Sequence, residues 1–313
     1  MSASLMIIST AIVTYRRSWA LKYSLNSLSI QTRQPDEVII ILKPSGDGSE
    51  EVVNEFRGKL PINLIVQESG GFVDAVDMAI RNSRSDVILF LDDDAVAEER
   101  WVEKYEHLFR DLKNAGGISG LTYRAYLCGA ELVKTSEPFY QNEPTAEIFY
   151  RKPLEEYIDY CGWISISGFM GLKRCTGVVV KSTSLDGVNM GLRIDAVRGC
   201  PLSQLYRRSK KGIWNEKILA YCAKKRGYDT YIVSEVSTAP VAWHIVHENS
   251  LTRGRGFWHE FWLHYDRVAN FWRLKRLGAR VSYVAYLIAL LVALRRRNLP
   301  RILATVYGLS VRI

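Results

Sequence analysis

Short apolar runs alternate with stretches of helical periodicity over the first 90 residues, and this alternation constrains the fold more than any other feature of the chain. The apolar runs are rich in β-branched residues and predict strands, whereas the stretches between them predict helices. The predicted strands are residues 5–13, 37–42, 64–66 and 87–91. The predicted helices are residues 19–30, 50–56 and 70–83. Strands and helices in this order predict a parallel α/β sheet, which binds its ligands at the carboxyl ends of its strands.

Three consecutive aspartates, Asp92, Asp93 and Asp94, directly follow the last of these strands. A buried strand that ends in three like charges needs a cation or hydrogen-bond donors to meet them. Carboxylates spaced D-x-D suit Mg²⁺ or Mn²⁺, which bridge the phosphates of a nucleotide. A solvated acidic turn is the alternative, but the strand before the triplet and the predicted helix after it, residues 97–112, disfavour it. We therefore expect Asp92 and Asp94 to bind a divalent metal.

Two predicted loops lie at the same edge of the sheet, because each follows a predicted strand. They carry Thr14, Tyr15, Arg17, Lys43, Ser45 and Asp47. Together with Asp92 and Asp93, these residues are predicted to bind the nucleotide part of a donor.

The chain resembles the family 2 glycosyltransferases over residues 5–255, and the motifs occur in the family's order. Residues 7–53 are similar to the family's opening strand, its T-Y-N-R loop, the helix that ends in S-x-x-x-Q-T and the second strand. ILFLDDDA matches the D-x-D motif, GVNMGLR at 187–193 resembles G-x-N-M-x-x-R, and IWNEKILAYCAKKRGY at 213–228 resembles the stretch with the catalytic acidic residue. The resemblance implies one nucleotide-binding α/β domain of the GT-A type with a mostly parallel sheet.

The resemblance also implies roles for single residues. Glu216 takes the role of general base, because an acceptor hydroxyl must lose its proton as it attacks the donor sugar. Trp214 and Asn215 are expected beside the acceptor, and Asn189 beside the donor sugar. Two alternatives stay open: Glu216 as a solvated helix residue, and Trp214 as a core residue instead of a sugar-stacking face.

A histidine near this place often completes the metal site in the family. His244 is the first choice and His247 the second, although a spacing of three also fits two structural histidines on one helical turn. The chain departs from the family at residues 42–45, where Leu-Lys-Pro-Ser replaces D-D-G-S and leaves the nucleotide base open. It departs again where Asn215 and Glu216 replace Glu-Asp, which keeps one carboxylate. The expected cofactor is Mn²⁺ or Mg²⁺.

The tail after residue 250 carries the net charge of the chain. It holds 12 of the 42 Lys and Arg residues against two of the 33 Asp and Glu residues, a net charge of +10. These charges alternate with apolar and aromatic residues and do not form a polar groove, so nucleic acid is not an expected partner. Trp258, Trp262 and Trp272 are aromatic anchors typical of a lipid interface. Residues 251–277 are therefore predicted to be amphipathic interfacial helices.

Two apolar blocks end the chain and predict a membrane-associated helical hairpin over residues 278–313. The first block, residues 281–294, is uncharged and precedes three arginines, and the second covers residues 302–311. Both are shorter than the about 20 apolar residues of a spanning helix, so spanning the membrane and lying on it both stay open. The alternative is a pair of buried core or dimer helices. With the arginines facing the cytoplasm, the catalytic domain, residues 1–250, is predicted at the cytoplasmic face of the cell membrane.

A catalytic domain followed by interfacial and membrane helices resembles a reduced cellulose-synthase-like plan, in which a basic and aromatic motif after the catalytic domain binds the diphosphate. Arg253 and Arg255 occupy the corresponding place and are candidate donor-binding residues. Five scattered cysteines contain no C-x-x-C, so neither zinc nor a disulfide framework is expected, and reduced cytoplasmic thiols fit.

Together these features predict metal-dependent, inverting transfer of a sugar from a nucleotide-sugar donor to a lipid-linked glycan acceptor. GDP-mannose is the first choice of donor, because the chain resembles membrane-bound archaeal mannosyltransferases of lipid-linked glycan assembly. A UDP-sugar-dependent enzyme and a processive polysaccharide synthase are the alternatives within the family. From other classes, LFLDDDAV also fits a D-x-D phosphatase with Asp92 as nucleophile, and the tail also fits a non-catalytic membrane-binding protein.

Overall fold

A mixed eight-stranded sheet forms the centre of the molecule, in the order β11-β13-β6-β12-β4-β1-β2-β3. The computed structural model describes residues 5–129, 131–140, 144–145, 148–247, 256–295 and 298–310. The strands of this sheet are β1 (Ile8–Thr14), β2 (Glu37–Leu42), β3 (Ile62–Val66), β4 (Val87–Leu91), β6 (Ala115–Ser119), β11 (Val179–Lys181), β12 (Asn189–Arg193) and β13 (Asp229–Val233). The first four strands pair in parallel, which confirms the prediction for the first 90 residues.

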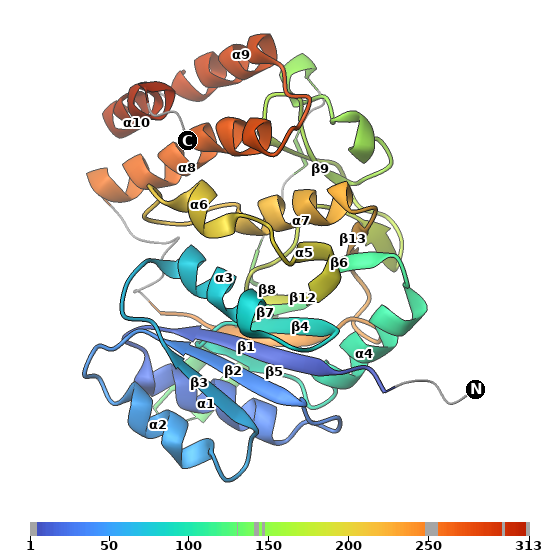
Figure 1. Ribbon diagram of the computed structural model, residues 1–313, viewed down its shortest axis with the longest axis vertical. Helices are drawn as coiled ribbons and strands as arrows, with labels where there is room; N and C mark the ends of the chain where they lie inside the picture. Colours follow the sequence, from blue (N-terminus) through green and yellow to red (C-terminus); the bar gives the residue numbers. More distant parts are fainter. Residues whose placement is uncertain are drawn as a thin grey trace.

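Helices cover both faces of the sheet (Figure 1). On one face lie α1 (Ser18–Ser29), α2 (Ser49–Phe56) and α4 (Trp101–Asp111), and on the other lie α3 (Phe72–Asn82), α5 (Ile194–Val197), α6 (Leu202–Tyr206) and α7 (Asn215–Lys225). A strand between two helical layers must be apolar on both sides. In β2, Val38 and Ile40 pack into one core, and Ile39 and Ile41 pack into the other. The continuous apolar runs of the sequence have this cause.

The second half of the sheet is not purely parallel. β12 runs antiparallel to both β4 and β6, and β11 runs antiparallel to β13. A second sheet has the order β5-β14-β7-β8. The other strands are β5 (Ala95–Ala97), β7 (Leu121–Cys128), β8 (Glu131–Pro138), β9 (Gly162–Ile164), β10 (Met170–Leu172) and β14 (Val241–Ile245), and the short 3-10 helices are η1 (Phe149–Arg151) and η2 (Glu155–Tyr157).

Three further helices follow, α8 (Phe257–Arg276), α9 (Tyr283–Leu294) and α10 (Leu299–Ser310). α8 lies beside α6 and α7, with α9 and α10 further out (Figure 1). Phe271 and Leu274 of α8 are fully buried, and the Asn270 amide donates to the Gly168 carbonyl at 2.7 Å. The predicted domain boundary at residue 250 therefore does not separate α8 from the catalytic core. Within the described part of the chain, none of the helices combines the length and the apolar character needed to cross a membrane.

Two disulfides correct the expectation of reduced thiols. They join Cys161 to Cys175 and Cys200 to Cys222, which lie 14 and 22 residues apart along the chain. Cys222 is part of α7, and Cys200 comes just before α6, so the second bond ties together two helices of one face. Because the partners meet only through the fold, their spacing in the sequence gave no C-x-x-C signal.

Candidate active site

The aspartate triplet directly follows β4, at the carboxyl end of the strand. Asp93 and Asp94 are buried, and Asp92 is half-buried. Arg17 approaches from the loop after β1: its Nη1 donates to Asp93 Oδ1 at 3.1 Å and also bonds Asp94. A cationic side chain therefore meets the buried carboxylates, as their burial requires.

His244 and His247 contact the two oxygens of the Asp94 carboxylate. His244 Nε2 lies 3.1 Å from Asp94 Oδ1, and His247 Nε2 lies 2.6 Å from Oδ2. Strand pairing produces this meeting, because β14 runs antiparallel to β5 and places His244 opposite Ala95. The Ile245 amide donates to the Asp94 carbonyl at 2.8 Å and extends this pairing. His244 therefore lies on a strand, and the alternative of a shared helical turn is wrong.

Asp92, Asp94 and His244 form a candidate metal site, because one ligand atom from each lies within 4.8 Å of the others. Carboxylate oxygens suit Mg²⁺ and Mn²⁺, and an imidazole nitrogen favours a transition metal such as Mn²⁺. These three ligand atoms therefore fit the expected Mn²⁺ or Mg²⁺. His247 lies outside this group and holds Asp94 by a hydrogen bond, which is how neighbours orient metal ligands.

Burial and the surrounding charges decide the protonation of the triplet. Burial and the Asp94 charge raise the pKa of Asp93 to about 7, and the same two causes raise the pKa of Asp92. For Asp94, burial is outweighed by the hydrogen bond from His247 and by the charges of His244 and Arg17, which hold the pKa below its usual range. A bound divalent cation would favour the ionised form of all three carboxylates.

A cavity of about 950 Å³ opens beside the triplet. Its volume is typical of small-molecule sites. Its lining includes many of the predicted site residues, namely Thr14, Tyr15, Arg17, Lys43, Asp92, Asp93, Trp214, Asn215, Glu216 and His244. One cavity thus holds the loops after β1 and β2 with the predicted nucleotide-binding residues, the candidate metal site after β4 and the predicted base at the start of α7. The candidate donor residues Arg253 and Arg255 lie outside the described residues.

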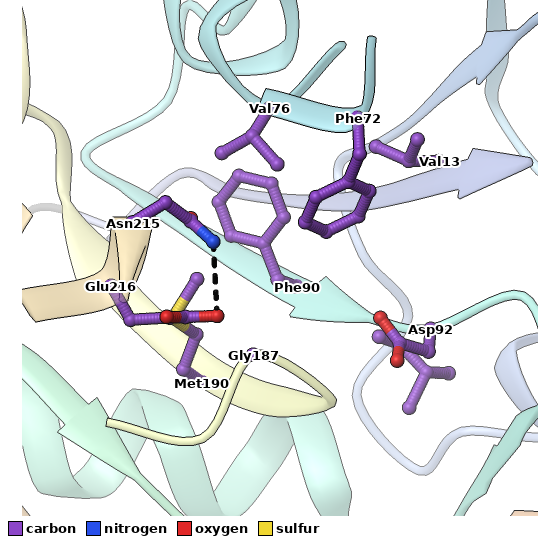
Figure 2. Close-up of a pocket in the computed structure, with 10 residues that line it drawn as sticks. Val13, Phe72, Val76, Phe90, Asp92, Gly187, Met190, Asn215 and Glu216 are labelled. Atoms are coloured by element: carbon purple, nitrogen blue, oxygen red, sulfur yellow. Dashed lines mark hydrogen bonds between the residues drawn. The ribbon is translucent and has the colours of Figure 1, made fainter. Parts of the chain in front are cut away.

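Glu216 is half-buried in the first turn of α7 and faces this cavity. Its Oε1 accepts a hydrogen bond from Asn215 Nδ2 at 3.1 Å (Figure 2). Burial raises the pKa of Glu216, which moves it toward the working range of a general base at neutral pH. A Cβ atom at Gly187 would lie 2.6 Å from Glu216 Oε1, so glycine leaves the room that the carboxylate occupies. Figure 2 shows Glu216 and Asp92 on opposite sides of a small pocket that adjoins the cavity.

Several titratable residues line the cavity without having been predicted from the sequence, Asp186 and Lys217 among them. Asp186 accepts hydrogen bonds from the Thr122 hydroxyl and from the Val188 amide, the latter at 3.0 Å. Burial raises the pKa of Asp186 to about 6 and lowers the pKa of Lys217 to about 8. Asp186 directly precedes the G-x-N-M segment and Lys217 directly follows Glu216, so adjacency to a motif was the available signal.

Asn189 has a different role from the predicted one. Its side-chain oxygen accepts hydrogen bonds from Trp101 Nε1 and Tyr105 Oη, both at 2.8 Å. Its side-chain nitrogen donates to the carbonyls of Leu121 and Pro240. The side-chain amide of Asn189 is fully buried, and all four of its hydrogen bonds go to other groups of the protein. The donor-binding prediction is therefore corrected to a structural role.

Ser45 and Asp47 organise the loop after β2 and are not part of the cavity lining. Asp47 accepts hydrogen bonds from the Ser18 amide at 3.0 Å and from the hydroxyls of Ser45 and Ser49 at 2.8 Å. Burial alone would raise the pKa of Asp47, but these hydrogen bonds outweigh burial and lower the pKa to about 2. The donor-binding prediction for both residues is corrected accordingly: Asp47 ties the starts of α1 and α2 together.

The fold is of the GT-A type found in glycosyltransferases. Residues 9–173, more than half of the chain, match the family model described as Glycosyl transferase family 2. The chain therefore belongs to glycosyl transferase family 2.

Similar proteins agree with this family. The chain is 36% identical over 102 residues to the uncharacterized glycosyltransferase YwdF of Bacillus subtilis (strain 168), over 32% of this chain and 37% of that protein. Among solved structures, S. aureus TarS 1-349 in complex with UDP-GlcNAc has a TM-score of 0.53 at 14% identity, covering 90% of this chain and 69% of that one. GalNAc-T7 with UDP, GalNAc and Mn²⁺ has a TM-score of 0.55 at 13% identity, covering 78% of this chain and 44% of that one. At such identities the structures establish the shared fold.

Proposed function

We propose that the protein transfers a sugar from a nucleotide-diphosphate sugar to an acceptor hydroxyl, with inversion and with a divalent metal. One observation carries the proposal: Asp92 and His244 of the candidate metal site and the carboxylate of Glu216 face the same cavity. A metal site on one side and a basic carboxylate on the other are the two parts that such a transfer needs.

Each part has a stated chemical role. Asp92, Asp94 and His244 would hold the cation, which when bound supplies positive charge to the leaving diphosphate. Arg17 and Lys43 line the same region and add to that charge stabilisation. Glu216 accepts the proton of the acceptor hydroxyl while the oxygen of that hydroxyl bonds to the sugar carbon and the nucleoside diphosphate leaves. A single displacement of this kind inverts the configuration of the carbon.

The donor is either a guanosine or a uridine nucleotide sugar. GDP-mannose follows from the resemblance to mannosyltransferases of lipid-linked glycan assembly. UDP-sugars are the alternative, and three solved structures of similar fold hold UDP or UDP-GlcNAc. The residues at 42–45 that replace D-D-G-S leave both bases open.

The proposal extends to the cell membrane, where the acceptor would be a lipid-linked glycan reached from the cytoplasmic side. It is supported by an apolar surface on the last two helices, which we call the tail face. Its exposed residues are Tyr283, Val284, Leu287, Ile288, Leu291, Leu299, Ile302, Leu303, Val306, Tyr307 and Leu309. Exposed basic residues of the tail, Lys275, Arg276, Arg280 and Arg295, add attraction to anionic lipid. Exposed apolar residues on both helices, together with basic residues of the tail, suit a position at the membrane surface.

A panel of nucleotide sugars tests the proposed function. GDP-mannose, UDP-glucose and UDP-GlcNAc are incubated with the protein in Mn²⁺, in Mg²⁺ and in a chelator, and release of nucleoside diphosphate is measured. We expect one donor to be turned over, and only with metal. The phosphatase alternative is tested in parallel with p-nitrophenyl phosphate. Phosphate release from that ester, with every nucleotide sugar intact, would contradict the proposal.

A further inference from the structure

A fully buried ion pair lies on α8, between Asp266 and Arg273. Arg273 Nη2 lies 2.6 Å from Asp266 Oδ1, and both side chains are 0% exposed. Arg273 also donates to the Leu205 carbonyl at 3.1 Å, and its guanidinium lies 3.7 Å from the centre of the Tyr206 ring. Such a pair is tolerated in a core only when its remaining polar atoms are satisfied as well. The partners of the second Asp266 oxygen therefore matter.

That second oxygen, Oδ2, faces the loop between α6 and α7. It accepts hydrogen bonds from the Ser209 hydroxyl at 2.8 Å and from the Ile213 amide at 3.1 Å. The Ser209 hydroxyl in turn accepts from the Gly212 amide at 2.8 Å. The Asp266 carboxylate of α8 is thus hydrogen-bonded to both ends of the segment 209–213.

The held segment ends in a strained turn. Trp214 has a φ of +67°, a left-handed conformation that is rare for a large side chain and persists only where neighbouring contacts enforce it. The carbonyl of Ile213, just before Trp214, accepts a hydrogen bond from the Tyr206 hydroxyl at 3.1 Å. Trp214 and Glu216 both line the cavity. The contacts made by Asp266 and Tyr206 fix the backbone immediately before the predicted base.

We propose that Asp266, held by Arg273, is a positioning residue for the acceptor side of the cavity. By fixing the Ile213–Trp214 turn it aims the Glu216 carboxylate at the acceptor hydroxyl. The inference deepens the proposed function and rests on it. The loops after β1, β2 and β4 make none of these contacts, so we expect the change to fall on acceptor transfer and not on nucleotide affinity, although the held segment lines the same cavity.

Ser209→Ala tests the proposal, because it removes two loop hydrogen bonds and leaves the buried ion pair intact. Asp266→Asn would leave Arg273 unpaired in the core and is expected to impair folding, so it is not the test variant. Ser203→Ala is the matched control: the Ser203 hydroxyl also donates to a carboxylate, Asp77 at 2.7 Å, but from α6 and away from the loop. Ser209→Thr, which keeps the hydroxyl, is the rescue variant.

Three quantities are measured. In Ser209→Ala, amide exchange at Gly212 and Ile213 should accelerate about tenfold, and turnover of the donor selected by the panel should fall about 10- to 100-fold. Affinity for UDP and for GDP in Mn²⁺ should stay unchanged. Ser203→Ala and Ser209→Thr should behave like the wild type in all three.

Faster exchange with full turnover would overturn the proposal, and so would unchanged exchange at both amides. An equal loss of nucleotide affinity would show a general structural role and would overturn it too. Failure of the wild type to turn over any nucleotide sugar would instead count against the proposed function, since the exchange measurement does not require catalysis.

Discussion

Asp92 and Glu216 face one small pocket from opposite sides (Figure 2). Asp92 belongs to the candidate metal cluster after β4, and Glu216 belongs to the first turn of α7. An inverting displacement needs the incoming oxygen and the leaving diphosphate on opposite faces of the sugar carbon. Two carboxylates on opposite sides of the pocket, one in the candidate metal site and one proposed as the general base, fit this requirement.

Glu216→Gln is expected to lower turnover by about 10² to 10⁴ while nucleotide affinity stays unchanged, because the amide cannot accept the acceptor proton. Glu216 acts only in its ionised form and burial raises its pKa, so wild-type turnover should rise with pH through that raised pKa. The variant should lack this rise. Steady-state rates across about pH 5 to 9 measure both effects, with Glu55→Gln on the exposed side of α2 as control. Near-normal turnover in Glu216→Gln would mean that the acceptor arrives already ionised.

Asp186 gives a prediction about stability. Its pKa is raised to about 6 by burial, so its ionisation is harder in the folded protein than in the unfolded chain. The free energy of unfolding that depends on Asp186 is therefore fully present at low pH and is lost as the pH rises through about 6. Asp186→Asn should stabilise the protein by about 2 kcal/mol at neutral pH and have little effect at pH 4. Urea unfolding at both pH values measures this, and an equal loss of stability at both would count against it.

At the scale of secondary-structure elements, α8 has two different sides. Its inner side joins the catalytic core through Leu274 and through the hydrogen bonds of the buried ion pair to Leu205 and Ser209. Its outer side packs against α10, where Glu260 bonds Arg301 and His264 bonds Thr305. Arg273 and Arg301 of the tail thus pair with acidic residues of α8, and only part of the +10 charge faces outward. The apolar tail face carries the remaining argument for a membrane surface.

The tail face is expected to bind lipid by burial of its apolar residues. Leu287 and Leu291 are 53% and 69% exposed on α9, so Leu287→Glu with Leu291→Glu should abolish sedimentation with anionic vesicles without affecting the fold. Ile158→Glu is the matched control, because Ile158 is 66% exposed outside the tail. The wild type and the control should stay bound in high salt. A wild type that remains in the supernatant as a dimer would show that the tail face is an interface between two copies.

Across the whole molecule, the strands and helices that depend on nearby residues could be predicted from the sequence, whereas most contacts between distant segments could not. Strands that are buried on both faces must be apolar along their length, so β1 to β4 and the loops at their ends could be read from the sequence. Pairings between distant segments could not be read from the local pattern. The family resemblance alone predicted that His244 joins the metal site, and nothing predicted that Cys200 bonds Cys222 or that the partners of Asn189 lie on α4, on β7 and at Pro240. Asp186 was missed for the same reason, because its burial arises from the assembled cavity.

We propose that the triplet after β4 binds a nucleotide through a divalent metal. Calorimetric titration of UDP and of GDP, with Mn²⁺ and with a chelator, measures this binding in the wild type and in Asp94→Asn. Asp159→Asn, at an exposed aspartate, is the control, and thermal melting checks that each variant is folded. The wild type and the control should bind one nucleotide with Mn²⁺ and lose it in the chelator, whereas folded Asp94→Asn should show no gain from Mn²⁺. Equal binding by Asp94→Asn, or binding by the wild type that ignores the metal, would contradict the account.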